Sequence, residues 1–272
     1  MSEVQVPAAA AEEAAPKRSL GSAVRRLIAD GAREWDLSER TIVAMVLVPI
    51  AIIIIGIITA VIGKGVYKWF VSEDHIAETG QAVAYFVALV LSVVVTLRLW
   101  RAERKGLAAL YGLFCIALFF QIGEEISWGQ RVFGWGTPET FSAVNKQSET
   151  NLHNVHGVGS TFKWIQMVAA GYGAIMALVL LRWKLPERRR ITASFLVAPL
   201  TLFLYFAPLF LWRIYRNVTE PPARFYFTVE EYNEVMELCF ALGIFLFVLF
   251  QIRRTSQRRL ASSLDLSDAG VP

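Results

Sequence analysis

Long apolar runs alternate with short polar segments along most of the chain. A helix needs about 20 mostly apolar residues to cross the hydrocarbon core of a membrane. Six stretches come close to that length. They are Thr41 to Gly63, Gln81 to Leu99, Leu107 to Ile122, Trp164 to Leu181, Thr192 to Trp212 and Val235 to Ile252. The sequence therefore predicts an all-α fold, a polytopic membrane helix bundle with about six transmembrane helices.

These spans divide the chain into three parts. Residues 1–40 are expected to form a cytoplasmic segment that is partly disordered, because its first residues are rich in Ala, Glu and Pro. Residues 41–252 form the transmembrane domain, with an ordered outer loop at 123–163, and residues 253–272 form a cytoplasmic tail. Within the first part, Leu20 to Asp36 has amphipathic spacing, typical of a helix on the membrane surface or of a short solvated helix.

Composition agrees with a membrane protein. Charged residues make up 18% of the chain and hydrophobic residues 55%, whereas a soluble domain carries roughly 25% charged residues. The net charge is +4, which membrane proteins reach through Lys and Arg in cytoplasmic loops. We therefore expect membrane lipids as partners and no nucleic acid. Cys115 and Cys239 fall inside apolar runs, so neither a disulfide framework nor a thiolate zinc site is expected.

The basic residues divide unevenly between two sets of loops. One set holds 19 Lys and Arg residues and the other holds 8. The first set is 1–40, 98–106, 182–191 and 253–272, and the second is 64–80, 123–163 and 213–237. Because cytoplasmic loops carry the excess of Lys and Arg, the first set, with both termini, is predicted to be cytoplasmic.

The outer loops hold the groups that could carry chemistry. All three histidines fall in them, together with clustered carboxylates, several of which adjoin an apolar run where an ionised group is costly unless paired or hydrated. The set is His75, His153, His156, Glu73, Asp74, Glu78, Glu124, Glu125, Glu149, Glu230, Glu231, Glu234 and Glu237. A single carboxylate at a helix end is usually a cap or a solvated residue. The interpretation of these residues as a functional site rests on the prediction that three loops meet on one side of the membrane.

Helical spacing groups some of these residues. If the third helix continues through Arg131, then Glu124, Trp128 and Arg131 share one face. Glu125 then lies on the adjoining stripe with Gln121.

The sixth helix has a similar pattern. Glu230, Glu234 and Glu237 share one face, and stacked like charges destabilise a helix unless something positive lies beside them. A metal ion, a protonated carboxyl or an arginine would serve. Glu149 and His153 are also four residues apart, so both could reach one ion if that segment is helical. Carboxylates with imidazole suit zinc, iron or manganese.

From these groups we assemble a candidate site. The expected ligands of a divalent metal are Glu124, Glu237, Glu78 and His153. Glu125 is the expected general base or a further ligand, and His153 is also assigned to catalysis, because a metal-bound water is a potential nucleophile. Substrate contacts are assigned to Arg131, Trp128, Asn151 and Asn154.

Four arginines oppose the positive-inside bias, namely Arg131, Arg213, Arg216 and Arg224. Arginine is the natural partner of phosphate or carboxylate. They bind either a lipid head group or an anionic substrate, or they pair with the nearby glutamates, and the last alternative is slightly favoured.

The loop from Ser127 to Lys163 is long for a connector, and it contains aromatic anchors and turn residues. We expect it to fold back as a cap over the outer mouth of the bundle and to return His153 to the carboxylates. Thr137 and Pro138 would start a short helix as N-cap and first residue.

The same loop carries the motif GEEISWGQR at 123–131, followed by FG at 133–134, TPE at 137–139 and NLHN at 151–154. This motif resembles a signature of a family of uncharacterised bacterial multi-pass membrane proteins. The resemblance implies the plasma (inner) membrane of a bacterium and no particular activity. The chain departs from alkaline-ceramidase-like hydrolases, since its last helix has no pair of histidines and the spans number six instead of seven.

Three functions remain open at this stage. The first is a metal-dependent enzyme acting on a lipid or lipid-linked substrate at the outer leaflet. The second is a transporter or channel that uses intramembrane carboxylates, although the acids crowd one end of the bundle. The third is a non-catalytic subunit or assembly factor.

Overall fold

The computed structural model describes residues 20–72, 75–145, 149–152, 155–183 and 185–256. Within these ranges the chain is helical and has no strand, which confirms the all-α class. In chain order the helices are α1 (Leu20–Trp35), α2 (Glu39–Ile62), α3 (Lys64–Val71), α4 (Ile76–Arg101), α5 (Lys105–Glu125), η1 (Ser127–Gly129), α6 (Gln130–Phe133), α7 (Glu139–Ser142), α8 (Gly159–Arg182), α9 (Glu187–Ser194), η2 (Leu200–Leu202), α10 (Phe203–Val218), η3 (Ala223–Phe225) and α11 (Tyr226–Arg254).

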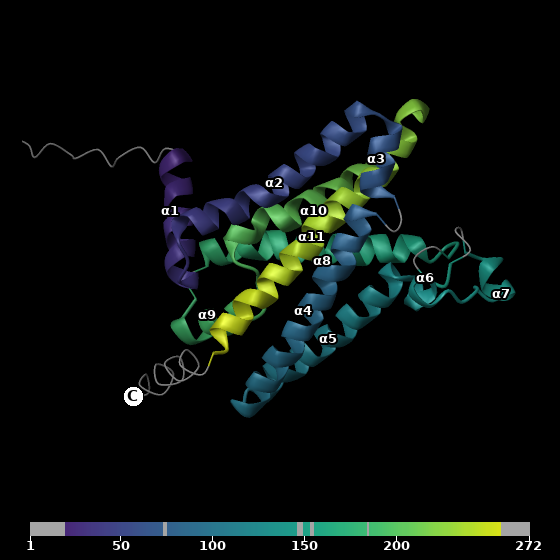
Figure 1. Ribbon diagram of the computed structural model, residues 1–272. Helices are drawn as coiled ribbons and strands as arrows, with labels where there is room; N and C mark the ends of the chain where they lie inside the picture. The colour runs from purple at the N-terminus through teal and green to yellow at the C-terminus, as the bar shows by residue number, and fades with distance from the viewer. Residues whose placement is uncertain (1–19, 73–74, 146–148, 153–154, 184, 257–272) are drawn as a thin grey trace, which may run out of the picture.

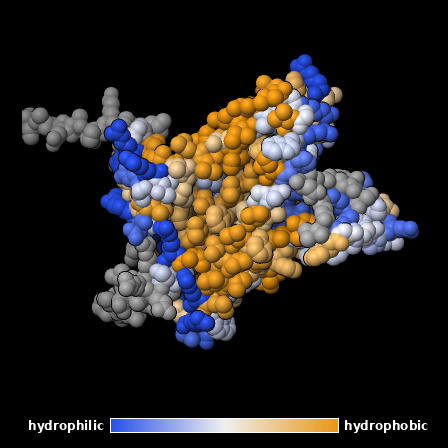
Figure 2. Space-filling view, viewed as in Figure 1, coloured by the Kyte–Doolittle hydropathy of each residue, from blue (hydrophilic) through white to orange (hydrophobic). Residues whose placement is uncertain are grey.

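Five helices in the described ranges are long and apolar enough to cross a membrane, as in a multi-pass membrane protein. They are Glu39–Ile62, Lys64–Arg101 (which contains α3 and α4), Lys105–Glu125, Gly159–Arg182 and Ala223–Arg254. Figure 2 shows the consequence, because a broad hydrophobic band covers the middle of the molecule and hydrophilic residues gather at its two ends. Such an apolar surface is stable in lipid and would aggregate in water.

The predicted fifth span, Thr192 to Trp212, is not one helix, so the count of six is not confirmed. α9 ends at Ser194 and α10 begins at Phe203. Pro199 interrupts the run, because proline has no N–H to donate and disfavours helical geometry in the residue before it. Carbonyl groups exposed by this break need partners in an apolar environment. The hydroxyl of Tyr111 donates to the carbonyl of Phe195 at 2.7 Å.

The central helix of the bundle is α11, which packs against α4, α10 and α2. Small residues allow close approach, as is usual between helices in membranes. A Cβ added at Gly243 of α11 would lie 2.7 Å from Tyr205 of α10, and one at Gly56 of α2 would lie 3.0 Å from Tyr232 and Val235. Figure 1 shows α11 in yellow between α2 and α4.

Both described ends of the chain lie at the same end of the bundle. Helix α1 crosses the start of α2 (Figure 1) and packs on the last turns of α11, where the Trp35 ring stacks on Phe250 with centroids 4.2 Å apart. Arg254 forms an ion pair with Glu34 at 3.0 Å, and Arg253 donates to the Trp35 carbonyl at 2.9 Å. The amphipathic helix predicted at the N-terminus is therefore present, with Trp35 buried against the bundle.

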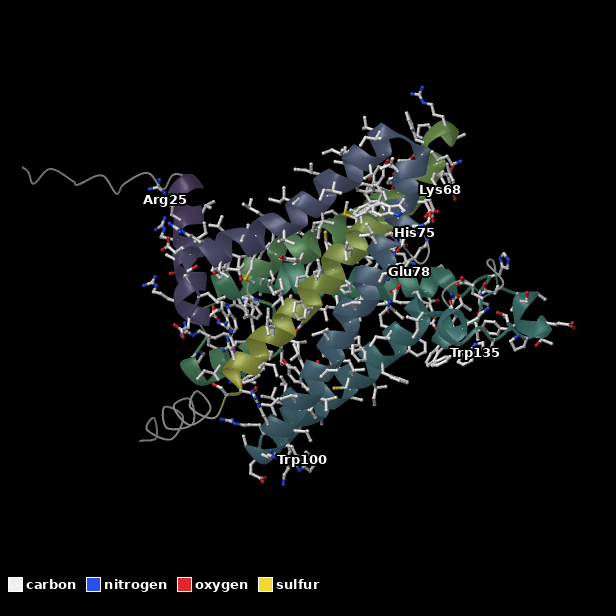
Figure 3. All side chains as sticks on the ribbon, viewed as in Figure 1. Arg25, Lys68, His75, Glu78, Trp100 and Trp135 are labelled. Atoms are coloured by element: carbon white, nitrogen blue, oxygen red, sulfur yellow. The ribbon has the colours of Figure 1, made fainter. Side chains whose placement is uncertain are left out.

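Helices α3, α6 and α7 lie at the opposite end of the bundle (Figure 1). Figure 3 marks the two ends by side chains, with Lys68, His75, Glu78 and Trp135 at this end and Arg25 and Trp100 at the other. As far as their residues are described, the two sets of loops distinguished by their basic residues therefore occupy different ends. We call the end with α3, α6 and α7 the distal end.

Candidate functional site

The last turn of α5 places two carboxylates at the distal end, Glu124 and Glu125, with 1% and 8% of their surface exposed. The condition under which Glu124, Trp128 and Arg131 would share one helical face, a helix that continues to Arg131, is not met. The helix ends at Glu125, and Ser127 and Trp128 adopt left-handed backbone conformations with φ of 48° and 54°. Such conformations are uncommon for residues other than glycine, and they break the helix here.

The turn after α5 brings Trp128 back onto the helix. Its indole N–H donates to Oε1 of Glu124 at 2.8 Å, and its ring lies against Gly123, where an added Cβ would meet it at 2.9 Å. Trp128 and Glu124 do lie together, as predicted. They are brought together by a turn that reverses the chain direction after α5, and not by a continuous helix. The second oxygen of Glu124 accepts the backbone N–H of Leu152 at 2.7 Å. The loop therefore returns to the end of α5.

A buried hydrogen-bond network holds this loop together. The side-chain amide of Asn151 donates to Oε2 of Glu149 at 2.6 Å and to the Ser127 hydroxyl at 3.1 Å. The amide of Asn145 donates to the Asn151 carbonyl at 2.8 Å. Asn151, which was assigned to substrate contact, thus connects the two halves of the loop. Residues 149–152 are not helical, so the spacing argument that joined Glu149 to His153 fails.

The short helix predicted at Thr137 is present as α7, but it begins at Glu139 with Pro138 as N-cap. The Thr137 hydroxyl donates instead to Oε1 of Gln130 at 3.0 Å. That oxygen also accepts the backbone N–H of Thr150 at 2.7 Å. Thr137 therefore joins the loop network and does not cap the helix.

A second polar cluster joins α8, α10 and α11 at the distal end. The guanidinium of Arg213 donates to Oε1 of Glu237 at 2.7 Å, and both residues are buried. The Gln166 amide donates to the other oxygen of Glu237 at 2.9 Å and accepts from Arg213 through its carbonyl oxygen. Asn233 also donates to Glu237. We call Gln166, Arg213, Asn233 and Glu237 the Arg213 cluster.

Two further glutamates of α11, Glu230 and Glu234, also accept hydrogen bonds from side chains. Glu230 accepts from Lys163 at 3.0 Å and from Arg216. Glu234 accepts from the Gln81 amide at 3.0 Å. Arginine is therefore the positive group beside Glu230 and Glu237, and the predicted pairing of Arg213 and Arg216 with nearby glutamates is confirmed.

A third group of carboxylates gathers around Glu234. Glu237, Glu125 and Glu78 all lie close enough for their charges to interact with it. Tyr85, with 1% of its surface exposed, interacts with Glu125, Glu234 and Glu237. The structure thus brings Glu125, Glu237 and Glu78 into one region between α4, α5 and α11. Glu124 belongs to the loop network instead.

Three of the predicted site residues fall wholly or in part outside the described part of the chain. His153 and Asn154 lie outside the described residues, as does the side chain of Arg131 in α6. In the ranges that are described, no group of three or more His, Cys, Asp or Glu side chains is arranged to hold a metal ion. The metal site with Glu124, Glu237, Glu78 and His153 stays a prediction.

An apolar cavity of about 700 Å³ lies among the same helices that hold the Arg213 cluster, together with α5. Its walls come from α5, α8, the segment between α9 and η2, α10 and α11. The lining residues include Tyr111, Phe114, Trp164, Phe206, Phe240 and Phe247. The size falls within the roughly 300–1,000 Å³ range of ligand pockets. Reasoning from the sequence missed this cavity, because its aromatic residues have the pattern of ordinary membrane-facing residues.

Comparisons of the chain with protein-family models, with curated proteins and with solved structures found no significant match. The family resemblance of the loop motif therefore stays a prediction.

Proposed function

We propose that this chain is an enzyme of the bacterial inner membrane that acts on a lipid or lipid-linked substrate at the outer leaflet, with both termini in the cytoplasm. The observation that carries this proposal is an apolar cavity whose walls include α8, α10 and α11, the three helices that also hold the buried Arg213 cluster. A lipid has the same division into a polar head and an apolar chain. Buried charges inside a membrane bundle usually mark a functional site.

Glu125 is the proposed general base. It is 8% exposed, its carboxylate accepts from Gln121 at 2.7 Å, and it lies near Tyr85 and Glu234. A carboxylate held away from bulk water beside other acids is a suitable proton acceptor. Glu237, by contrast, is fixed by Arg213, Gln166 and Asn233, and we assign it to positioning Arg213.

A divalent metal remains part of the proposal only if His153 supplies a ligand. The carboxylates of Glu78 and Glu125 would then be the nearest oxygen donors, since Glu237 is engaged by Arg213 and Glu124 by the loop. Elemental analysis of the purified protein tests this directly. About one metal ion per chain in the wild type, lost in a His153→Ala variant, supports it, and a metal-free wild-type protein with full activity removes it.

The experiment for the main proposal compares cellular lipids. Cells that lack the gene should differ from wild-type cells in one lipid class. Wild-type protein should restore that class, and Glu125→Gln should not. Glu139→Gln, the same substitution at an exposed carboxylate of α7, is the matched control and should restore it. A lipid composition that does not depend on the gene would refute the enzyme.

A transporter is the second candidate, and a specific observation favours it. Tyr85 and Ser92 on α4 are buried, and in the described ranges neither hydroxyl has a hydrogen-bond partner. Buried hydroxyls along one helix can form part of a path for protons. Proton flux into vesicles containing the purified protein distinguishes the two functions, since an enzyme of this kind need carry none.

A further inference from the structure

Helix α1 has an apolar stripe along one side and arginines on the rest of its surface. Four of its apolar residues recur at intervals that place them on one face of a helix, namely Val24, Leu27, Ile28 and Trp35. Arg25, Arg26 and Arg33 lie outside this stripe. A helix with such a division binds where an apolar surface meets a polar one.

The C-terminal half of α1 packs on the bundle through this stripe. Gly31 and Trp35 are buried, and a Cβ added at Gly31 would lie 2.7 Å from Thr201. The Trp35 ring stacks on Phe250 of α11. In this half, the stripe is therefore turned toward the interior of the bundle.

The N-terminal half extends the same stripe beyond the contacts with the bundle. Val24 is 47% exposed, and a Cβ added at Gly21 would meet nothing within 4 Å. Residues on one face of a helix point to the same side, so Val24 is turned to the side that Trp35 faces. Figure 1 shows α1 lying across the direction of the long helices, and Figure 2 shows that the hydrophobic band begins beside this end. An apolar side chain in this position meets the edge of the bilayer.

The N-terminal half of α1 also carries positive charge with no acid beside it. Residues 20–28 include no Asp or Glu. Arg25 and Arg26 are exposed, and within the described residues neither forms an ion pair. The two acids further along the helix are already engaged, Asp30 by Arg33 and Glu34 by Arg254. Two positive charges are therefore left for a partner outside the helix.

These arginines do not stabilise the helix itself. The N-terminal end of a helix carries a partial positive charge, so acids are favourable there and cations are not. Helix α2 follows this rule with Glu39 in its first turn, whereas the first turn of α1 has no acid. A membrane surface rich in anionic lipid attracts Lys and Arg side chains that lie next to it. Such a surface would satisfy the arginines and the stripe together.

We propose that the N-terminal half of α1 lies in the surface of the lipid bilayer and binds anionic phospholipid there. Val24 and Leu27 contact the hydrocarbon, and Arg25 and Arg26 bind lipid phosphates through charge-assisted hydrogen bonds. Because the other half of α1 is fixed to the last turns of α11 through Trp35, this contact holds that end of the bundle at the membrane surface. The inference does not depend on the proposed enzyme.

A photoreactive amino acid at Val24 tests the lipid contact in vesicles that contain the purified protein. The vesicles hold equal amounts of phosphatidylglycerol and phosphatidylcholine with identical chains. Val24 should give lipid adducts. Asp30 should give few, because it lies on the charged side of α1 and its side chain is 65% exposed. Equal lipid adducts at the two positions, or adducts only with protein at Val24, would overturn the placement of α1 in the bilayer.

The head groups of the lipids captured at Val24 test the role of the arginines. Phosphatidylglycerol should exceed phosphatidylcholine by at least about fivefold, the effect expected of one arginine beside an anionic surface. Arg25→Gln should lower this preference, and the double variant with Arg26→Gln should bring the two lipids to nearly equal amounts. Arg25→Lys with Arg26→Lys keeps both charges and should keep the preference. Equal capture of the two lipids by the chain with both arginines would overturn the selection of anionic phospholipid.

Arg33→Gln is the matched control for Arg25→Gln. It removes one positive charge from the same helix, at a side chain that is 79% exposed and paired with Asp30. Arg33 lies on the side opposite the stripe, so the preference for phosphatidylglycerol should persist in this variant. An equal loss of preference in the two variants would overturn the assignment of Arg25 as a lipid ligand, because the net charge of α1 alone would then explain the selection.

Discussion

At the scale of single residues, Arg213 and Glu237 form a buried ion pair in the apolar part of a helix bundle. Burying two charges is expensive unless their remaining hydrogen-bonding groups are also satisfied. Both oxygens of Glu237 have partners, from Arg213 and Asn233 on one side and from Gln166 on the other. The hydrogen bonds from the amides of Gln166 and Asn233 therefore offset part of the desolvation cost of burying this ion pair.

Breaking this pair should destabilise the protein. Glu237→Leu or Arg213→Leu alone leaves the other charge buried without its partner, and removal of one partner of a buried pair costs about 3–5 kcal/mol. The double variant Glu237→Leu with Arg213→Leu should recover most of that loss. The free energy of unfolding in detergent, measured for both single variants and the double variant, gives the coupling. Effects of the two single changes that simply add would show that the pair does not contribute as a unit.

The sequence indicated the charged members of the site but not the amides. Glutamates on one face of the last helix repel one another, and this repulsion predicted a positively charged partner such as arginine. Gln166 and Gln81 lie inside or at the edge of apolar runs, and that position is the signal that could have identified them. A polar amide in an apolar helix has to hydrogen-bond to another helix.

At the scale of helices, the end of α5 depends on the reversal at Ser127 and Trp128. Trp128→Phe keeps the ring against Gly123 but removes the hydrogen bond to Glu124. Glu124 also accepts from Leu152, so backbone hydrogen exchange in residues 149–152 should rise about tenfold, the equivalent of ~1.4 kcal/mol. Trp135→Phe, at a partly exposed ring stacked on Phe133, serves as the control. Equal exchange in the two variants would mean that Glu124 does not hold the loop.

The contact between α8 and α10 depends on glycine. A Cβ at Gly173 would lie 2.6 Å from the ring of Phe206, whereas one at Gly112 of α5 would meet nothing within 4 Å. Gly173→Ala should therefore cost about 1–3 kcal/mol, as overpacking does. Gly112→Ala should be neutral or slightly stabilising, because alanine favours helix. Thermal unfolding in detergent compares them, and equal melting temperatures would contradict the packing described for these helices.

Helix positions were predictable to within a few residues where apolar runs were uninterrupted, as in α2 and α8. The predicted helices were wrong where the backbone geometry of particular residues outweighs the hydropathy of the run. The run from Thr192 to Trp212 is apolar enough for a span, yet Pro199 breaks it, and the carbonyls of Phe195 and Leu196 are bonded by tyrosines of α5 and α8. Ser127 and Trp128 carry no sequence signal for left-handed geometry, since glycine is its usual residue.

At the scale of the whole molecule, the uneven distribution of basic residues predicts the orientation. The end that holds α1 and the last turn of α11 carries most of the Lys and Arg residues, so it should face the cytoplasm. Reporter fusions after Leu99 and after Leu181 should report the cytoplasm, and one within residues 140–150 should report the exterior. A cytoplasmic signal from the last fusion would move the Arg213 cluster to the inner leaflet.

The cavity could not be predicted from the sequence because it depends on how four helices diverge. Its lining residues come from α5, α8, α10, α11 and the broken segment at 195–198. Each of these stretches alone has the pattern of a membrane span. Only the break before Pro199 hinted at an irregular region within the bundle, and breaks of this kind are tolerated where they are buried in protein or line a cavity.

The central claim, a lipid substrate held in the apolar cavity, is tested most directly by photo-crosslinking in intact membranes. A photoreactive amino acid is placed at Val168, inside the cavity, or at Ile116, outside it, two positions of nearly equal exposure (65% and 66%). Mass spectrometry then identifies the adducts. A single lipid class enriched at Val168, against a mixture of bulk lipids at Ile116, is the predicted result. The same lipid mixture at both positions would contradict the account.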